Sequence, residues 1–244
     1  MQTSAGTQFP LGATVTGDGV NFALYSAHAK QVELCLADDQ GEELRVPVSQ
    51  QTDDIWHIHV YGLGAGTRYG YRVYGDWLPE LGHRFNAQQR LLDPYARAYE
   101  RRPEHQLTEM PWCQVVEPTI PPAPLAEKLP REDLVIYETH VKGFTQLNSD
   151  ISPAQRGKYR GLASETAINY LKDLGVNAVE LLPVYEFTDE LFLVDKGLVN
   201  YWGYNPVSFF MPSSRYAETD ARGEFIEMVS RLHEAGIEIG RAHV

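Results

Sequence analysis

Residues 19–25 have the sequence Gly-Val-Asn-Phe-Ala-Leu-Tyr, and their two-residue period decides how the first part of the chain folds. Val20, Phe22 and Leu24 lie on one side of this segment, and Asn21, Ala23 and Tyr25 lie on the other. Such alternation is typical of a β-strand that is buried on one face. The same period returns, with turn residues rich in Gly and Asp in between, at residues 32–36, 56–60 and 69–73. Short strands separated by regular turns predict an antiparallel, immunoglobulin-like β-sandwich over residues 1–100.

The pattern changes after residue 100. Seven of the 15 prolines lie in the region 103–130, and proline neither continues a helix nor fills a central strand. We therefore expect an extended, proline-rich linker over residues 101–132.

From residue 133 onward, apolar runs and helix signals alternate. The apolar runs that predict strands lie at residues 134–137, 178–184 and 237–239. Ser164 is an N-cap signal for a first helix that ends at Gly175, and a second helix ends at Gly236. Residues 185–219 are expected to form a long loop. The strand–helix–strand–helix–strand order predicts a parallel sheet with right-handed crossovers.

A closed (β/α)8 barrel takes about 250 residues, so residues 133–239 can hold only the first strands and helices of a truncated barrel. A sheet this small also leaves its edges unpaired and one face uncovered. Residues 240–244 do not fit a strand, and residues 238–244, Glu-Ile-Gly-Arg-Ala-His-Val, match the translation of a common sequencing adapter. We expect residues 240–244 to be a non-biological tail, in which Arg241 and His243 have no role.

Composition excludes several classes of protein. The 244 residues include 21 Lys and Arg against 33 Asp and Glu, a net charge of −12, which argues against a general affinity for nucleic acid or anionic membranes. With 43% hydrophobic residues the chain can bury a sizeable core, so it is not disordered. No apolar run approaches the length of a membrane span and no signal peptide is visible, so the cytoplasm is the expected location. The two cysteines, Cys35 and Cys113, indicate neither a disulfide framework nor a zinc site.

Six segments, in order, resemble the isoamylase-type glycogen debranching enzymes of the α-amylase superfamily, glycoside hydrolase family 13. They are GVNFALYS at 19–26, YGYRVYG at 69–75, GHRFN at 82–86 with LLDPYA at 91–96, IYETHVKGFT at 136–145, LGVNAVELLPV at 174–184 and NYWGYNP at 200–206. The GHRFN run and the VKGFT that follows His140 favour debranching over branching enzymes. The resemblance implies a starch-binding-type module of carbohydrate-binding module family 48 before the start of a catalytic barrel.

The resemblance also implies an α-1,6-glucosidase of glycogen catabolism, whose partner is a branched α-glucan such as glycogen or limit dextrin. Such retaining glycosidases use an Asp nucleophile and a Glu acid/base about 5 Å apart. In the family these carboxylates, with a third one, lie on later barrel strands. We therefore assign no catalytic residue within this chain and expect the chain itself to be inactive. No metal or organic cofactor is implied, and the sequence carries no signal for an oligomeric state. The alternatives are a noncatalytic α-glucan-binding module and a fragment of a related branching or trehalose-forming enzyme.

Tyr204 is the one candidate substrate-binding residue. By resemblance it matches an aromatic residue that stacks on the glucose ring in the −1 subsite, and a phenol ring suits an apolar sugar face. For Tyr201 and Trp202 we favour packing within the loop. Asn200 and Asn205 could orient sugar hydroxyls, but we favour turn chemistry for both.

Three other groups have both a functional and a structural interpretation. Glu138 and His140 share one face of a predicted strand, and we favour a hydrogen-bonded structural pair over a metal or acid/base site. Glu180 interrupts an apolar strand, and a buried carboxylate needs a partner, so we expect an ion pair or a hydrogen bond inside the sheet. The glycine-rich run at 62–66 lies between strands and is expected to be a turn rather than a phosphate-binding loop.

Aromatic residues of the β module offer a weak glucan-binding hypothesis. Trp56, Trp77 and Tyr71 could form a sugar platform, although aromatic residues of a sandwich are more often core. His57 and His59 alternate with apolar residues and are expected to face solvent. Two histidines on one strand face are too few for a zinc site.

Overall fold

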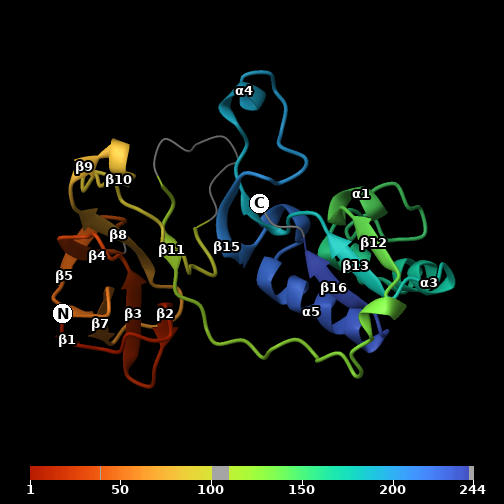
Figure 1. Cartoon of the computed structure of the whole chain (residues 1–244), viewed down its shortest axis with the longest axis horizontal. Coiled ribbons are helices and arrows are strands. Elements are labelled where there is room, and N and C mark those ends of the chain that lie inside the picture. The colour runs from red at the N-terminus through yellow and green to blue at the C-terminus, as the bar shows by residue number, and fades with distance from the viewer. Residues whose placement is uncertain (39, 101–109, 242–244) are drawn as a thin grey trace. The chain divides into compact units, whose positions relative to one another are not determined.

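The computed structural model describes residues 1–38, 40–100 and 110–241. The chain forms two compact units, Met1–Thr119 and Ile120–Val244, and each is considered by itself (Figure 1).

Unit 1 contains two antiparallel sheets. The first has the order β1 (Thr3–Ser4), β7 (Ile55–Tyr61), β3 (Gly19–Tyr25) and β2 (Gly12–Val15), with β6 (Gln50–Thr52) also paired to β7. The second has the order β11 (Cys113–Gln114), β8 (Arg68–Tyr74), β4 (Gln31–Ala37) and β5 (Glu43–Val48). The four strands that the two-residue period predicts are therefore confirmed as β3, β4, β7 and β8. A small hairpin of β9 (Trp77–Leu78), the 3-10 turn η1 (Pro79–Leu81) and β10 (His83–Arg84) extends this unit.

Strand β3 is buried on both faces, so the expected burial on one face only is wrong. Every residue from Gly19 to Leu24 is buried, and Tyr25 alone is exposed. Asn21 faces the side that we expected to be open, and its side-chain amide pairs with the backbone of Thr7 through two hydrogen bonds of 2.8 and 2.9 Å. The N-terminal segment thus covers this face and supplies the hydrogen bonds that a buried amide requires.

The prediction that His57 and His59 face solvent is also wrong, because both are buried. His57 Nδ1 lies 2.7 Å from the carbonyl oxygen of Ala5, and its Nε2 lies 2.9 Å from Thr52 Oγ1. His59 Nε2 lies 3.0 Å from Thr16 Oγ1. Hydrogen bonds to Ala5, to Thr52 in β6 and to Thr16 after β2 therefore satisfy both buried imidazoles.

Unit 1 continues beyond the predicted boundary at residue 100. Strand β11 pairs with β8, with Cys113 opposite Tyr69, and the neighbouring Trp112 and Val115 are buried. The start of the predicted linker is therefore wrong, since residues 112–115 belong to the second sheet. Residues 101–109 lie outside the described residues.

A buried carboxylate lies inside unit 1. Asp93 accepts hydrogen bonds of 2.8 Å from the hydroxyl of Tyr69 and from the amide of Tyr95. Burial raises the pKa of Asp93 to about 6, although these two hydrogen bonds oppose the shift. Cys35 and Cys113 are free thiols, and burial raises the pKa of each to about 12. Protonated, buried thiols are unreactive, which fits a structural role.

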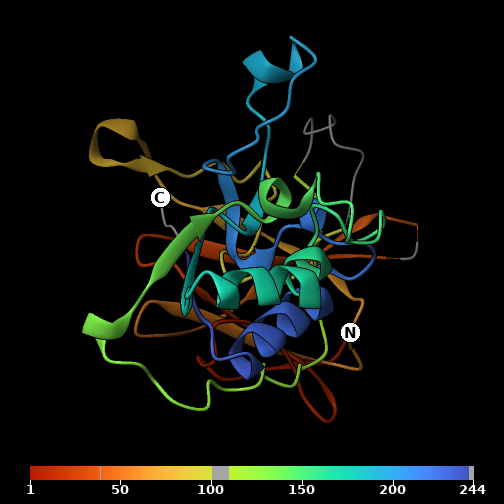
Figure 2. The ribbon, with the colours of Figure 1, turned by 90° about the vertical axis from the view of Figure 1, so that its right-hand side faces the viewer.

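Unit 2 is built on a three-stranded parallel sheet with the order β12 (Ile136–Thr139), β13 (Ala178–Leu181) and β16 (Glu238–Arg241). Helices α3 (Glu165–Asp173) and α5 (Ala221–Glu234) contribute to the core on one face of this sheet (Figure 2). That core includes Ile168, Leu171, Val179, Leu181, Met228, Leu232 and Ile237. The predicted order of strands and helices is therefore confirmed.

The helix ends follow their local signals. Ser164 Oγ accepts a hydrogen bond of 3.2 Å from the amide of Ala167, as an N-cap residue does. Gly175 has a φ of +81°, and its amide donates to the carbonyl oxygen of Lys172. This left-handed residue closes α3 in the way that glycine allows without strain.

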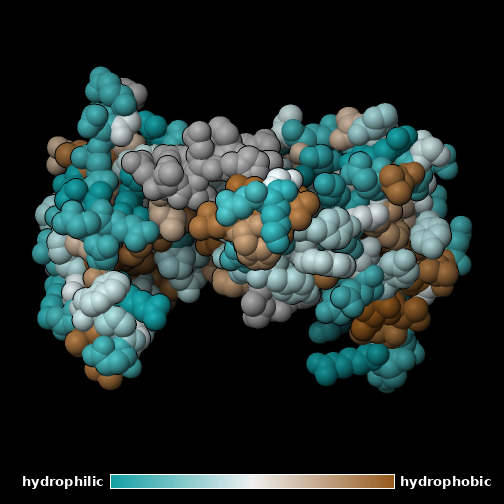
Figure 3. All heavy atoms as spheres, turned by 90° about the horizontal axis from the view of Figure 1, so that it is seen from above, coloured by the Kyte–Doolittle hydropathy of each residue, from teal (hydrophilic) through white to brown (hydrophobic). Residues whose placement is uncertain are grey.

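The region predicted as one long loop, residues 185–219, contains regular structure. It holds β14 (Tyr185–Phe187), α4 (Leu191–Val194), β15 (Pro206–Pro212) and the 3-10 turn η3 (Ser214–Tyr216). Strands β14 and β15 pair with each other in an irregular antiparallel ladder. Strand β14 has only three residues, and its partner β15 begins and ends with proline, so neither strand has a clear local signal in the sequence. Only their pairing in the folded chain reveals them. Apolar side chains gather at the end of the loop that carries α4 (Figure 3).

The opposite face of the parallel sheet is largely open. Ile136 and Glu138 are exposed and Glu180 is half-buried, with Glu138 opposite Glu180 in the register of β12 and β13. Within the part of the chain that the structure describes, Glu180 has no ion-pair or hydrogen-bond partner, so the expected structural pair is not formed. Strand β16 continues through Gly240 and Arg241, which pair with Glu180 and Leu181. The expectation that the strand stops at 239 is therefore wrong, and residues 242–244 lie outside the described residues.

Candidate functional site

The loop at residues 200–206 carries the candidate residue Tyr204, and hydrogen bonds made by the side chains of two asparagines fix its shape. Asn200 Oδ1 accepts a hydrogen bond of 2.8 Å from the amide of Gly203, which has a φ of +81°. Asn205 Nδ2 donates to Thr188 Oγ1 at 3.1 Å. Asn200 thus stabilises a turn, which confirms turn chemistry for this residue, whereas Asn205 ties the end of the loop to Thr188, 17 residues earlier.

A buried ion pair anchors the start of this loop. The Asp189 carboxylate accepts two hydrogen bonds, of 2.9 and 3.0 Å, from the Arg215 guanidinium in a bidentate arrangement. Asp189 Oδ1 also accepts from the amide of Asn200 at 2.7 Å. The Arg215 guanidinium in addition lies 4.4 Å from the centre of the Phe187 ring. Asp189 therefore joins η3, β14 and the loop through charge-assisted hydrogen bonds.

His140 lies at the centre of an aromatic cluster directly after β12. Its Nδ1 accepts from the amides of Lys142 and Gly143 and caps the short helix α1 (Val141–Thr145). Its Nε2 lies 2.7 Å from the carbonyl oxygen of Tyr201 and 3.2 Å from the hydroxyl of Tyr216. Burial lowers the pKa of His140. Glu138, by contrast, is exposed and contacts none of these groups, so the predicted Glu138–His140 pair is wrong while a structural role of His140 is confirmed.

The three aromatic residues of the loop lie in different environments. Tyr201 stacks on the His140 ring with centroids 4.2 Å apart and an interplanar angle of 11°, and Trp202 contacts the edge of Tyr201 at 5.2 Å. Packing is therefore confirmed for Tyr201, whereas Trp202 contacts Tyr201 and His140 edge-on but remains 56% exposed. Tyr204 is 42% exposed and makes no hydrogen bond or ring contact with other described residues. Its ring is available to a ligand, and its role stays a prediction.

The three aromatic residues considered as a sugar platform in the β module do not lie together. Tyr71 is buried in the core of the second sheet, and Trp56 belongs to the first sheet, where its Nε1 donates to the carbonyl oxygen of Ser26. Trp77 lies on the β9–β10 hairpin and is 62% exposed. The core interpretation is therefore confirmed for Tyr71 and wrong for Trp77.

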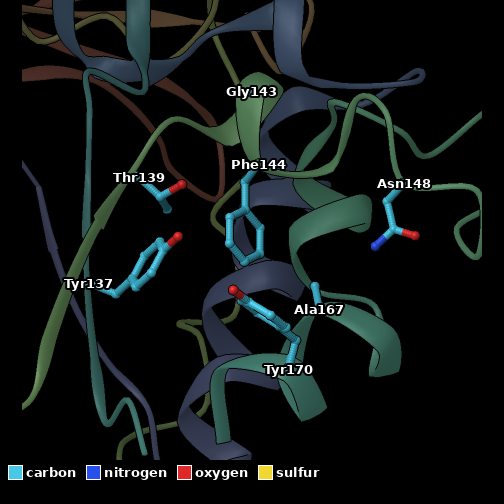
Figure 4. Close-up of a pocket in the computed structure, with 7 residues that line it drawn as sticks. All are labelled: Tyr137, Thr139, Gly143, Phe144, Asn148, Ala167 and Tyr170. Atoms are coloured by element: carbon cyan, nitrogen blue, oxygen red, sulfur yellow. The ribbon is translucent and has the colours of Figure 1, made fainter. Parts of the chain in front are cut away.

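A pocket of about 500 Å³ lies beside α1 in unit 2 (Figure 4). Its lining consists of Tyr137, Thr139, Gly143, Phe144, Asn148, Ala167 and Tyr170. The rings of Tyr137, Phe144 and Tyr170 contact one another in series, with centroids 5.8 and 6.0 Å apart. Sequence reasoning did not find this pocket. The alternation of Tyr137 and Thr139 on one strand face was the only available signal, because the helices that complete the lining come from distant segments.

Two absences concern the residues that the structure describes. Across residues 1–38, 40–100 and 110–241, no three His, Cys, Asp or Glu side chains are grouped closely enough to hold a metal ion. No helix in the same ranges has the length and apolar character that crossing a bilayer requires.

Comparison with known proteins relates both units to carbohydrate-active enzymes. Residues 10–96 match the family of carbohydrate-binding module 48 (isoamylase N-terminal domain). Glycogen debranching enzymes of Klebsiella pneumoniae (strain 342) and Escherichia fergusonii are 44% and 42% identical to 97% and 98% of the chain. The chain spans 39% of the length of each of these relatives.

Solved structures show a similar fold. A pullulanase from Anoxybacillus sp. LM18-11, complexed with maltotetraose, aligns with 95% of this chain and 34% of its own at a TM-score of 0.72 and 25% identity. A pullulanase from Bacillus acidopullulyticus aligns with 95% of this chain at a TM-score of 0.71. Residues 10–96 therefore match the carbohydrate-binding module 48 (isoamylase N-terminal domain), and the chain as a whole is similar to 39% of the length of glycogen debranching enzymes.

Proposed function

We propose that this chain is the glucan-binding and N-terminal part of a cytoplasmic α-1,6-glucosidase that removes branches from glycogen or limit dextrin. The observation that carries the proposal is the match to glycogen debranching enzymes along 97% of the chain. The matched module over residues 10–96 supports a branched α-glucan as the partner.

We infer further that the parallel sheet of unit 2 is the start of a (β/α)8 barrel. The strand order β12-β13-β16 and the helices on one face support this inference. The face that carries Ile136, Glu138 and Glu180 would then point into the barrel. On this proposal Tyr204, which follows the second strand, stacks on a glucose ring of the substrate, while the catalytic carboxylates come from later strands.

The reaction itself can be tested by product analysis. A protein that contains this chain together with the remaining barrel strands is expected to release linear maltooligosaccharides from branched limit dextrin. The 244-residue chain alone is expected to release none. New branch points in the product would indicate a transferase instead, and release of maltooligosaccharide by the 244-residue chain would contradict the assignment of catalysis to later strands.

Glucan binding by unit 1 is expected to depend on Trp77. An exposed indole ring offers a flat apolar surface that suits the apolar face of a glucose unit. Native electrophoresis in gels that contain glycogen should show retardation of the chain. Trp77→Ala should weaken the apparent affinity at least about 5-fold, since one stacked aromatic ring contributes roughly 1 kcal/mol or more.

Tyr25→Ala is the matched control, because Tyr25 is an aromatic residue of the same unit with 58% exposure. This variant should migrate like the unaltered chain. Equal retardation of the Trp77→Ala variant would contradict the site, and an unaltered chain that glycogen does not retard would contradict glucan binding by the module.

A further inference from the structure

The two ring nitrogens of His140 perform different tasks, and the hydrogen bonds fix which of them carries the proton. Backbone amides can only donate, so Nδ1, at 3.0 and 3.1 Å from the amides of Lys142 and Gly143, must be an unprotonated acceptor. In a neutral imidazole the proton is then on Nε2, which donates to the carbonyl oxygen of Tyr201 at 2.7 Å. One imidazole therefore caps α1 and ties it to the loop 200–206.

The faces and edges of the same ring hold the loop from other directions. Tyr201 stacks on the ring, while Tyr216 and Trp202 approach it edge-on with centroids 5.4 and 6.4 Å away. The Tyr201 hydroxyl occupies the space that a side chain at residue 143 would fill, so Gly143 lets the Tyr201 ring lie across the start of α1. Among these contacts, the Nε2–carbonyl hydrogen bond acts directly on the loop backbone.

The loop backbone has few other anchors on the side of α1. Asp189 holds its first amide, at Asn200, and Asn205 holds its end to Thr188. Between these two points lie Trp202 and Tyr204, both substantially exposed. Within this middle part, Asn200 Oδ1 accepts a hydrogen bond from the amide of Gly203, while the Tyr201 carbonyl oxygen and the Tyr201 ring both contact His140.

We propose that His140 is the positioning residue of this site: through its Nε2–H and its ring face it holds the loop 200–206 in the conformation that presents Trp202 and Tyr204 to a glucan chain. The assignment of glucan as the ligand rests on the proposed function, whereas the ordering of the loop does not. Protonation of the imidazole places a proton on Nδ1, opposite two amide hydrogens, and so disrupts the cap. The Nε2–H donor is retained, so the loop anchor is lost only when the ring turns away from these amides.

The sign of the pH dependence follows from the surroundings of the ring. The titratable groups that face it are Lys142 on α1, Tyr201 on the loop and Tyr216 on η3. Burial first, and then the Lys142 charge, lower the pKa of His140 in the closed loop, while the hydrogen bond to Tyr201 opposes this shift. An open loop exposes the imidazole to water, where its pKa is about 6.5. The open form therefore binds protons more readily, and the loop should open more often as the pH falls below about 6.5.

Limited digestion of the 244-residue chain with chymotrypsin tests the proposal, because this protease cleaves after aromatic residues and can report on Tyr201, Trp202 and Tyr204 directly. Cleavage after Phe192, which is 59% exposed on α4, serves as the internal reference in the same digest. The measured quantity is the ratio of loop cleavage to Phe192 cleavage, determined by mass spectrometry. Because both sites meet the same protease, this ratio cancels changes in protease activity with pH.

Two substitutions separate the tasks of the two nitrogens. Asn at position 140 can supply an acceptor near Nδ1 but lacks the Nε2 donor, whereas Gln can place an amide donor near Nε2. His140→Asn should raise the cleavage ratio about 10-fold or more, and His140→Gln should stay within about 3-fold of the unaltered chain. The unaltered chain should show a rising ratio between pH 7.5 and 5.5, and His140→Gln should show none.

An unchanged ratio in His140→Asn, or the same large increase in both variants, would overturn the positioning role. If His140→Asn fails to fold, Gly143→Ala provides a second test, because its methyl group displaces the Tyr201 ring from the other side and should also raise the ratio. Digestion in the presence of maltoheptaose then tests separately whether a glucan binds the loop. Protection of the loop supports glucan as its ligand, whereas an absence of protection with the His140 effects intact would contradict the proposed function and leave the positioning role standing.

Discussion

Replacement of Asp189 by alanine is expected to lower the free energy of unfolding of unit 2 by about 3–5 kcal/mol, the usual effect of removing one partner of a buried ion pair. The carboxylate is almost fully buried and accepts two hydrogen bonds from Arg215 and one from the amide of Asn200. Without it, the Arg215 guanidinium, whose side chain is only 19% exposed, loses two charge-assisted hydrogen bonds. Urea titration, followed by hydrogen exchange of peptides from β13 and α5, measures the loss.

Two control variants define the origin of this effect. Asp195→Ala removes an exposed carboxylate from the same loop region and should change the unfolding free energy by no more than about 0.5 kcal/mol. In a double-mutant cycle, Arg215→Ala combined with Asp189→Ala should be less destabilising than the sum of the single substitutions, because neither charge then remains unpaired. Additive losses would mean that the two side chains stabilise the unit independently.

The stability of unit 1 is expected to fall as the pH rises from about 4 to about 6, because of Asp93. Burial raises the pKa of this carboxyl to about 6, against about 3.9 in an unfolded chain. The folded form thus holds its proton more tightly, so the stabilisation is complete below about pH 4 and is lost as the pH passes about 6. At 1.36 kcal/mol per pKa unit, the full difference amounts to about 3 kcal/mol.

Comparison of variants isolates this contribution. Asp93→Asn should remove the decline between pH 4 and 6, as measured by urea unfolding of unit 1 at a series of pH values. Glu43→Gln is a contrasting control, since the bidentate Arg72 guanidinium lowers the pKa of Glu43 to about 2. Glu43 therefore contributes stability that is lost as the pH falls from about 4.5 toward 2. A decline between pH 4 and 6 that persists in Asp93→Asn would show that another group is responsible.

Much of the architecture is predictable from local patterns. The two-residue period at 19–25 and its three repeats predict β3, β4, β7 and β8, and Ser164, Gly175 and Gly236 predict the helix ends. Each of these signals acts within a few residues of the chain, through strand pleating, capping hydrogen bonds or a left-handed glycine. The order of the parallel strands follows because each crossover connects neighbouring elements.

Other features depend on segments that meet only in the folded chain. His57 appears polar and solvent-facing in sequence, but the carbonyl oxygen of Ala5 and the hydroxyl of Thr52 make its burial favourable. Strand β11 exists because Cys113 meets Tyr69, and β14 exists because it meets β15. A single sequence carries no signal for such partners when they lie twenty or more residues apart.

The candidate site shows the same division. The sequence alone determines that this chain combines a β-sandwich with parallel βαβ units, and it places Tyr204 in a turn bounded by Asn200 and Asn205. Only the tertiary structure decided that His140, sixty residues earlier, caps α1 and binds the Tyr201 carbonyl oxygen, and that Trp77 rather than Tyr71 is the exposed aromatic residue. The physical reason is that helix caps and strand periods are short-range effects, whereas burial and hydrogen-bond partnership are set by whichever distant segment covers a side chain.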